Sequence, residues 1–160
     1  MSDLEELEAI KRVKYKYLRC IDTKRFDELG ECFTEDAEAA YDKGKYSAAG
    51  RKAVLEFLVG ALEREDVASM HNVHCPELEL TSPSTAKGSW YLHDYVINPG
   101  EENGAMPARS ILQGAGFYSD EYVKIDGEWK IRFTGYERTF EYIRPYVEGE
   151  GVTLRTRWNA

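Results

Sequence analysis

The segment from Ala86 to Ile97 reads AKGSWYLHDYVI, and its side chains alternate in character with a period of two residues. β-Branched and aromatic residues favour extended backbone, and such alternation is typical of a strand with one buried face. The face that this pattern predicts to be buried carries Ala86, Gly88, Trp90, Leu92, Asp94 and Val96. We therefore expect a long strand here, with Asp94 as the one charged side chain on its buried face.

Three more segments alternate in the same way and extend the strand pattern along the chain. They are residues 77–82, 109–124 and 128–140. The dipeptide Asp126-Gly127 separates the last two segments and is typical of a tight β-hairpin turn. Residues 98–108 are rich in proline and glycine and are expected to form a loop. The second half of the chain is therefore predicted to be an antiparallel sheet.

The first part of the chain has helical periodicity instead. Apolar residues recur at steps of three and four from Leu4 to Ile21, and Ser2 with Glu5 forms a capping-box pattern in front of them. Shorter helical patterns follow at 26–33 and 54–62. Helices followed by long antiparallel strands indicate an α+β fold, in which a curved sheet closes over the helices as a cone with one open end. We expect one domain, residues 1–140, and a tail, residues 141–160, that packs at a subunit interface.

The composition limits the classes of partner. With 160 residues, 42% hydrophobic and 31% charged, the chain has the size of one ordinary domain. Its 29 acidic and 21 basic residues give a net charge of -8, which argues against a nucleic-acid partner held through its phosphates. No window approaches the ~20 consecutive apolar residues of a membrane span, and the N-terminus has no signal-peptide pattern. We expect a cytoplasmic protein without a membrane partner.

Motifs for metals, cofactors and nucleophiles are absent from the sequence. It has no nucleophile elbow, phosphate-binding loop, dinucleotide fingerprint or HExxH pattern. Cys20, Cys32 and Cys75 are an odd number without paired spacing, which predicts reduced thiols. His71 and His74 are the nearest approach to a metal pair, but on a strand they would face opposite sides. We expect neither a metal nor a cofactor.

Three polar residues carry the sequence's best indications of chemistry. Asp94, on the buried face, either pairs with a cation or takes part in proton transfer. Asp22 lies at the C-terminal end of the first helix, where a negative charge is unfavourable, and it either caps the next helix or accepts a hydrogen bond from a histidine across the cavity. His71 follows the third helix and is either a general base oriented by a carboxylate or a hydrogen-bonded core residue.

The chain is also rich in aromatic residues, with 11 Tyr, 6 Phe and 3 Trp. Most of them fit packing in a β-rich core or on an oligomer surface, such as that expected around Tyr91 and Tyr95. Tyr17 lies on the apolar face of the first helix, one to two turns before Asp22. It is therefore either a core aromatic or a phenol in the same region as Asp22.

Five motifs taken together resemble those of a known family. They are Ile10-Lys11-x3-Tyr15-Lys16-Tyr17-Leu18-Arg19-Cys20-Ile21-Asp22, Phe26-Asp27-Glu28-Leu29, Ser69-Met70-His71-x2-His74-x-Pro76-Glu77, Gly88-Ser89-Trp90-Tyr91-Leu92-His93-Asp94 and Gly116-Phe117-Tyr118-Ser119-Asp120-x-Tyr122-x-Lys124-Ile125-Asp126-Gly127-x-Trp129. The segment from Ala9 to Phe140 resembles the SnoaL-like branch of the nuclear transport factor 2-like superfamily, and within it bile-acid 7-alpha-dehydratase and scytalone dehydratase-like lyases. The resemblance implies a cone-shaped α+β barrel, with N-terminal helices packed in a strongly curved mixed or antiparallel sheet.

The same resemblance implies which residues form the site. The catalytic residues would be Tyr17, Asp22, His71 and Asp94, with Asp22 orienting His71 as the base. The substrate-binding residues would be Tyr41, Trp90, Tyr118 and Arg138. The resemblance also implies a homo-oligomer, with a trimer favoured over a dimer.

These assignments predict a cofactor-independent lyase that acts on a hydrophobic, aromatic or polycyclic, oxygenated small molecule. His71 would remove a proton next to a carbonyl or aryl group, and Tyr17 would hydrogen-bond the developing oxyanion. Asp94 would protonate the departing hydroxyl or assist loss of a small fragment such as formaldehyde. Two alternatives stay open, an isomerase of the ketosteroid type and a noncatalytic ligand-binding module.

Overall fold

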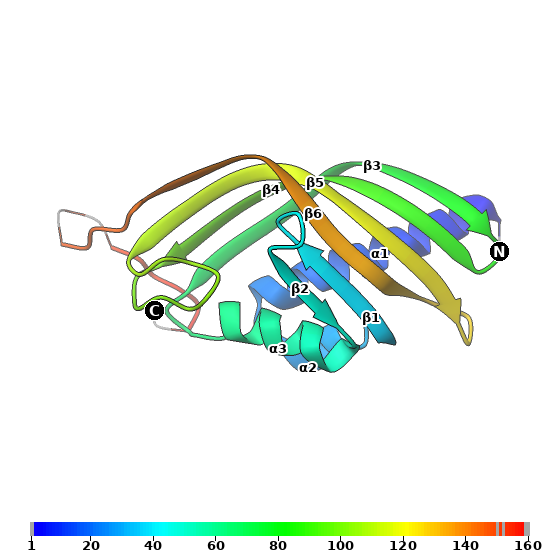
Figure 1. The fold of residues 1–160 in the computed structure, drawn as a ribbon, viewed down its shortest axis with the longest axis horizontal. Helices are drawn as coiled ribbons and strands as arrows, with labels where there is room; N and C mark the ends of the chain where they lie inside the picture. The colour runs from blue at the N-terminus through cyan, green and yellow to red at the C-terminus, as the bar shows by residue number, and fades with distance from the viewer. Residues whose placement is uncertain (1, 150, 152, 159–160) are drawn as a thin grey trace.

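A 20-residue helix, α1 (Asp3–Asp22), lies along the concave side of a curved sheet in the computed structural model (Figure 1). The structure describes residues 2–149, 151 and 153–158. The predicted capping box is confirmed: the Ser2 hydroxyl accepts from the backbone N–H of Glu5, and the Glu5 carboxylate accepts from the backbone N–H of Ser2 at 2.7 Å. Both bonds satisfy donors that the first helical turn leaves unpaired.

Two shorter helices, α2 (Phe26–Gly30) and α3 (Arg51–Leu62), complete the helical layer. The second helix ends earlier than the pattern at 26–33 predicts, because Phe33 already begins a strand. Within the described residues, no helix has an apolar stretch long enough to cross a membrane.

The sheet has six strands in the order β2-β1-β6-β5-β4-β3. Every neighbouring pair is antiparallel except β1 and β6, which run parallel, so the sheet is mixed. The expected α+β fold with helices packed against a curved mixed sheet is therefore confirmed. The strands are β1 (Phe33–Tyr41), β2 (Tyr46–Ala49), β3 (Ala68–Ser82), β4 (Thr85–Asn98), β5 (Ser110–Ile125) and β6 (Glu128–Pro145).

The sequence patterns miss β1 and β2 and place the start of β3 too late. The middle of β1 buries only small residues, Ala37 and Ala39, which have low strand propensity and give weak alternation between the buried ends of the strand. β3 begins at Ala68 rather than at residue 77, because its polar first half pairs with the second half of β4. A bulge between His74 and Glu77, where Cys75 has a φ of 46°, then shifts the register.

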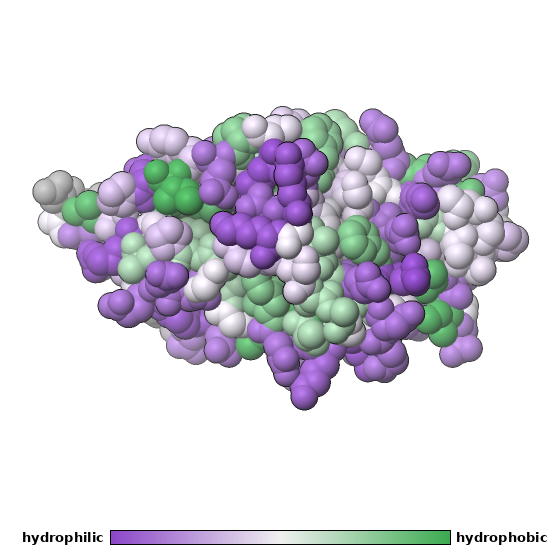
Figure 2. All heavy atoms as spheres, viewed as in Figure 1, coloured by the Kyte–Doolittle hydropathy of each residue, from purple (hydrophilic) through white to green (hydrophobic). Residues whose placement is uncertain are grey.

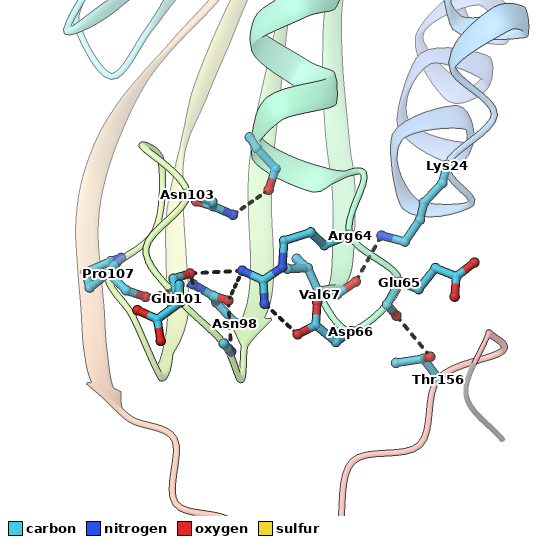
Figure 3. Close-up of polar contacts among 12 residues, drawn as sticks. Lys24, Arg64, Glu65, Asp66, Val67, Asn98, Glu101, Asn103, Pro107 and Thr156 are labelled. Atoms are coloured by element: carbon cyan, nitrogen blue, oxygen red, sulfur yellow. Dashed lines mark hydrogen bonds and ion pairs between the residues drawn. The ribbon is translucent and has the colours of Figure 1, made fainter.

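The last strand, β6, continues past the strand end predicted at residue 140 and ends at Pro145. The division into a domain of residues 1–140 and a tail stays a prediction. Beyond β6 the chain turns back toward its own α3–β3 connection (Figure 3). The Thr156 hydroxyl donates to the carbonyl of Glu65 at 3.2 Å, and Lys24 Nζ lies 4.5 Å from the centre of the Trp158 ring. Packing of this tail against a second subunit stays a prediction.

Large apolar side chains also remain exposed on the outer side of the sheet. Tyr91 and Phe117 stack there with ring centres 4.8 Å apart, and Phe140 and Tyr142 are exposed farther along the sheet. Hydrophilic side chains cover much of the face shown in Figure 2, with hydrophobic groups between them. That the outer side of the sheet forms the interface of a homo-oligomer, trimeric or dimeric, stays a prediction.

Gly60 lies in the interior of α3 and is exposed, and a Cβ built on it would have no atom within 4 Å. Gly60→Ala is therefore expected to stabilise the protein by about 0.5–1 kcal/mol, because glycine loses more backbone entropy in a helix than alanine. Chemical denaturation measures this free energy of unfolding. Gly127→Ala is the matched control, since its Cβ also has open space but its φ of 84° makes alanine destabilising. A destabilised Gly60→Ala variant would contradict the expectation.

Candidate active site

A cavity of about 290 Å³ lies between α1, α3 and the inner face of the sheet. This volume is at the low end of the range typical of small-molecule sites, about 300–1,000 Å³. Six of the eight predicted site residues line it directly, namely Tyr17, Tyr41, His71, Asp94, Tyr118 and Arg138. The wall is mostly aromatic and aliphatic, with a few polar groups that converge on it.

Asp22 is the last residue of α1 and contacts His71, a residue of β3 that lines the cavity. The Oδ1 atom of Asp22 lies 2.7 Å from His71 Nδ1 and accepts a hydrogen bond from the Ser69 hydroxyl at 2.8 Å. The Oδ2 atom of Asp22 accepts a hydrogen bond from the backbone N–H of His71 at 2.8 Å. The hydrogen-bond alternative for Asp22 is thus confirmed. The capping alternative is wrong, since α2 begins after Arg25 without a side-chain cap.

The protonation of this pair follows from its contacts. Burial acts to raise the pKa of Asp22, but hydrogen bonds and the charge interaction with His71, aided by Ser69, outweigh it and leave the pKa lowered. An ionised carboxylate only accepts hydrogen bonds, so His71 Nδ1 carries the proton. In the neutral form of the ring Nε2 is then the nitrogen with the free lone pair, and this tautomer is suited to accept a proton from a ligand in the cavity.

Three phenols, those of Tyr17, Tyr41 and Tyr118, line the same cavity as His71. The hydroxyls of Tyr17 and Tyr41 are 3.0 Å apart, and the ring of Tyr118 meets that of Tyr17 edge to face. Burial raises the pKa of all three phenols well above the ordinary value. They are therefore neutral and able to donate hydrogen bonds to a ligand oxygen.

Asp94 forms an ion pair with Arg138 from β6, so the expectation that it pairs with a cation is confirmed. Its two oxygens accept from the guanidinium at 2.8 and 2.7 Å, and Arg138 Nε lies 3.1 Å from Glu141. Burial acts to lower the pKa of Arg138, but the bonds to Asp94 outweigh it and raise the pKa above its usual range. A role of Asp94 in proton transfer stays a prediction.

The sheet register sets these groups in one row. His71 pairs with Asp94, Asp94 pairs with Gly114, and Gly114 pairs with Glu141. Directly opposed residues have Cβ atoms about 5 Å apart on the same face. Gly114 leaves the space that Arg138 occupies, because a Cβ there would lie 2.1 Å from Arg138 Nη1. His71 and Asp94 are thus neighbours in a single row, and the guanidinium of Arg138, whose backbone pairs with Gly116, lies over Gly114 in that row.

Comparison with known proteins gives a family for this fold and cavity. Residues 2–134 match the SnoaL-like domain family. The chain belongs to that family. The SnoaL-like fold also recurs over nearly the whole chain in solved structures.

Three of these structures illustrate the likeness. A candidate scytalone dehydratase from Novosphingobium aromaticivorans DSM 12444 has a TM-score of 0.76 and 23% identity, with 95% of this chain and 97% of that chain covered. A candidate aromatic ring hydroxylase from Novosphingobium aromaticivorans has a TM-score of 0.75 and 18% identity, with 91% and 96% covered. Hexachlorocyclohexane dehydrochlorinase LinA-type3 from Novosphingobium barchaimii LL02 has a TM-score of 0.72 and 21% identity, with 96% and 100% covered. At these identities the likeness concerns the SnoaL-like fold alone.

Trp90 is the predicted substrate-binding residue that lies outside the cavity lining. Its indole N–H donates to the Tyr122 hydroxyl at 3.0 Å, and its ring meets Tyr15 edge to face. Trp90 and Asp94 share the inner face of β4, but they are four residues apart, about 13 Å along a strand. Alternation predicts the face and not the place along it. In this SnoaL-like domain Trp90 is a buried core residue outside the cavity lining, and its expected role in substrate binding stays a prediction.

The prediction missed several residues that shape the cavity. Phe57 of α3 stacks on Tyr41 with ring centres 5.5 Å apart and on Tyr46 at 5.3 Å, and these three rings form an aromatic wall. Tyr136 meets Tyr41 at 5.5 Å. Tyr136 could have been found, because the alternation of 128–140 puts it on the same face as Arg138. Phe57 carried no signal beyond an apolar helix position.

The loop between β4 and β5 forms part of the cavity rim, with lining residues from Glu102 to Pro107. Figure 3 shows Arg64, which follows α3, reaching into this loop. Its Nη1 donates to Asn98 Oδ1 at 3.2 Å and to the Glu101 carbonyl at 2.9 Å. Asn103 donates from the loop to the Ala61 carbonyl of α3 at 2.7 Å. The loop is therefore hydrogen-bonded both to the last turn of α3, through Ala61, and to the residue Arg64 just after the helix.

No group of three or more His, Cys, Asp or Glu side chains that could hold a metal ion occurs among residues 2–149, 151 and 153–158. His71 and His74 do not belong to such a group, and Nδ1 of His71 is already hydrogen-bonded to Asp22. The polar groups of the SnoaL-like cavity thus include an imidazole, phenols and an ion pair, and Asp42, Lys45, Glu102 and Glu141 are also among its lining residues.

Proposed function

We propose that this protein is a cofactor-independent lyase that eliminates water, or another small group, from an uncharged, hydrophobic, oxygenated small molecule. The observation that carries the proposal is the imidazole of His71, held by Asp22 at 2.7 Å and open to an aromatic cavity. Membership of the SnoaL-like family supports it, as do the names dehydratase and dehydrochlorinase among similar structures.

The chemistry follows from the roles available to each group. His71 Nε2 takes a proton from a carbon next to a carbonyl or aryl group, and Asp22 stabilises the imidazolium that forms. The hydroxyls of Tyr17 and Tyr41 hydrogen-bond the oxygen on which negative charge develops. The electrons of the broken C–H bond form the new double bond as the neighbouring C–O bond breaks. The departing oxygen then takes up the proton and leaves as water.

In this proposal the departing oxygen of the ligand lies next to the Asp94–Arg138 ion pair. Both Asp94 oxygens accept hydrogen bonds from Arg138. A carboxylate in this arrangement orients the guanidinium, whose N–H groups can donate to the departing oxygen, in place of donating a proton itself. The proton for the departing oxygen then comes from the His71 imidazolium, which lies in the neighbouring strand position.

Two properties of the cavity support an uncharged, flat ligand. The rings of Tyr41, Phe57 and Tyr46 form a continuous aromatic wall. The guanidinium of Arg138 is already neutralised by Asp94 and Glu141. A carboxylate or phosphate beside this pair would therefore meet acidic side chains without an unpaired arginine to receive it. The lysine of the cavity lining, Lys45, is exposed, and its Nζ lies 5.0 Å from the centre of the Tyr46 ring, away from this pair.

Turnover of fused-ring β-hydroxy ketones in D2O, followed by mass spectrometry, tests the proposal. We expect a product lighter by one water, and a His71→Gln variant that binds the ketone but does not convert it. A product that loses no atoms and is heavier than the ketone by one mass unit for each carbon-bound solvent deuterium would indicate an isomerase instead. Binding without any change in mass would indicate a noncatalytic module, and unchanged conversion by His71→Gln would exclude this base.

A further inference from the structure

A fully buried lysine lies directly beneath the phenols of the cavity. Lys14 is on α1, one turn before Tyr17, and its side chain is 0% exposed. Its Nζ forms an ion pair with Asp120 of β5 at 2.8 Å. Lys14 does not line the cavity, so any effect on a ligand must act through its neighbours.

The partner carboxylate is held from several sides. Asp120 accepts the Tyr122 hydroxyl on Oδ2 and the Thr134 hydroxyl on Oδ1, each at 2.7 Å. The Trp90 indole donates in turn to the Tyr122 hydroxyl at 3.0 Å. A buried ion pair is rarely better for stability than apolar side chains of the same volume, because both charges lose their hydration. Stability alone therefore gives little reason for this pair.

The side-chain nitrogen of Lys14 contacts the rings that lead to the cavity. Burial lowers the pKa of this amine, whereas the charge of Asp120 and the hydrogen bond to it act to keep the amine ionised. Lys14 Nζ lies 3.3 Å from the centre of the Tyr118 ring and 4.9 Å from the centre of the Tyr17 ring. A cation at such distances is attracted to the π-face and favours negative charge on the same ring. The Tyr17 hydroxyl continues from its ring to the Tyr41 hydroxyl at 3.0 Å in the cavity. The nitrogen of Lys14 thus contacts the rings of Tyr118 and Tyr17, and the Tyr17 hydroxyl contacts that of Tyr41.

We propose that Lys14 is a positioning residue of the active site: its ammonium fixes the ring planes of Tyr17 and Tyr118 and favours negative charge on the oxygen atoms that these phenols present or bind. The consequence for a reaction rests on the proposed lyase function, in which Tyr17 hydrogen-bonds a developing oxyanion. The electrostatic effect on the phenol itself does not rest on it, and can be measured without any substrate.

The test places 3,5-difluorotyrosine at position 17, since its phenol ionises at lower pH than that of tyrosine and its phenolate has its own absorbance. Lys14→Met keeps most of the side-chain volume and removes the charge. We expect the midpoint of phenolate formation to rise by about one pH unit or more in Lys14→Met. An unchanged midpoint, or no phenolate in the parent protein before alkaline unfolding, would overturn the proposal.

Two further variants separate this effect from loss of structure. Lys124→Met removes another lysine of a largely buried ion pair, with Glu6 of α1 at 2.6 Å, and is expected to leave the midpoint unchanged. If Lys14→Met alone does not fold, Lys14→Met/Asp120→Asn removes both charges of the pair. The Asp120 carboxylate acts to raise the pKa of Tyr17, so its loss offsets part of the effect, and a smaller rise of the midpoint is expected for the double variant. With a converted ketone in hand, Lys14→Met should lower kcat by about tenfold or more at a nearly constant KM. A raised midpoint without any turnover would sustain the proposal and reject the lyase.

Discussion

Asp22→Asn is expected to lower turnover of a converted compound by about 10²–10⁴-fold, the range that a positioned general base contributes. Each oxygen of Asp22 now accepts at least one hydrogen bond: Oδ1 faces His71 Nδ1 and the Ser69 hydroxyl, and Oδ2 faces the backbone N–H of His71. Asparagine replaces one of these oxygens with an NH2 group. In place of Oδ2 that group would meet the backbone N–H donor of His71. In place of Oδ1 it would donate to Nδ1 and thereby move the imidazole proton to Nε2, the atom that has to accept a proton.

Steady-state kinetics with a separate measurement of ligand binding checks this expectation. The effect should appear in kcat, because Asp22 lies behind the imidazole and is not itself part of the cavity lining. Asp27→Asn is the control, since Asp27 is exposed on α2 and undergoes the same chemical change. Turnover of Asp22→Asn within twofold of the parent would show that His71 does not depend on this carboxylate.

Gly114→Ala is expected to cost about 1–3 kcal/mol of unfolding free energy, as overpacking of a filled site does. The added Cβ would lie 2.1 Å from Arg138 Nη1 and 3.0 Å from Asp94 Oδ1. The guanidinium would have to move by about 1 Å to restore ordinary contact, which breaks the two-bond pairing with Asp94. Activity should fall as well, by about tenfold or more in kcat/KM, because the misplaced group then faces the departing oxygen wrongly.

Denaturation curves and kinetics measure the two parts of this prediction. Gly60→Ala serves as the control for a glycine-to-alanine change without a steric contact. Arg138→Lys separates charge from geometry, since an ammonium keeps the charge but cannot form two parallel bonds to one carboxylate. A Gly114→Ala protein with parent stability and an intact Asp94–Arg138 pair in its crystal structure would refute the steric argument.

The features that could be predicted from sequence are those that depend on local periodicity. Alternation from Ala86 to Ile97 placed Asp94 on the inner face, and the end of α1 placed Asp22 where a partner was needed. Both inferences concern one element at a time. The contact between Asp22 and His71, 49 residues apart, came from the family resemblance and from the choice between two alternatives.

The features that could not be predicted depend on where elements meet. Trp90 is on the expected face of β4, but the position along the strand at which α3 and the loop enclose a cavity is a tertiary property. β1 was missed because alanine occupies buried positions in the middle of the strand, and alanine does not give the alternation of large apolar and polar residues by which a strand is identified. The Lys14–Asp120 pair was also missed, since each residue alone reads as a surface charge.

The hydrogen bonds between α3 and the β4–β5 loop bear on how a ligand enters. Asn103 and Arg64 join the loop to the end of the helix from two directions, and Gly100 makes room for the arginine, since a Cβ there would lie 1.8 Å from its Nη2. A loop held in this way cannot swing open as a free flap without losing several hydrogen bonds together. Loop and helix are therefore expected to move together, and the rate at which a ligand enters or leaves the cavity depends on the motion of both.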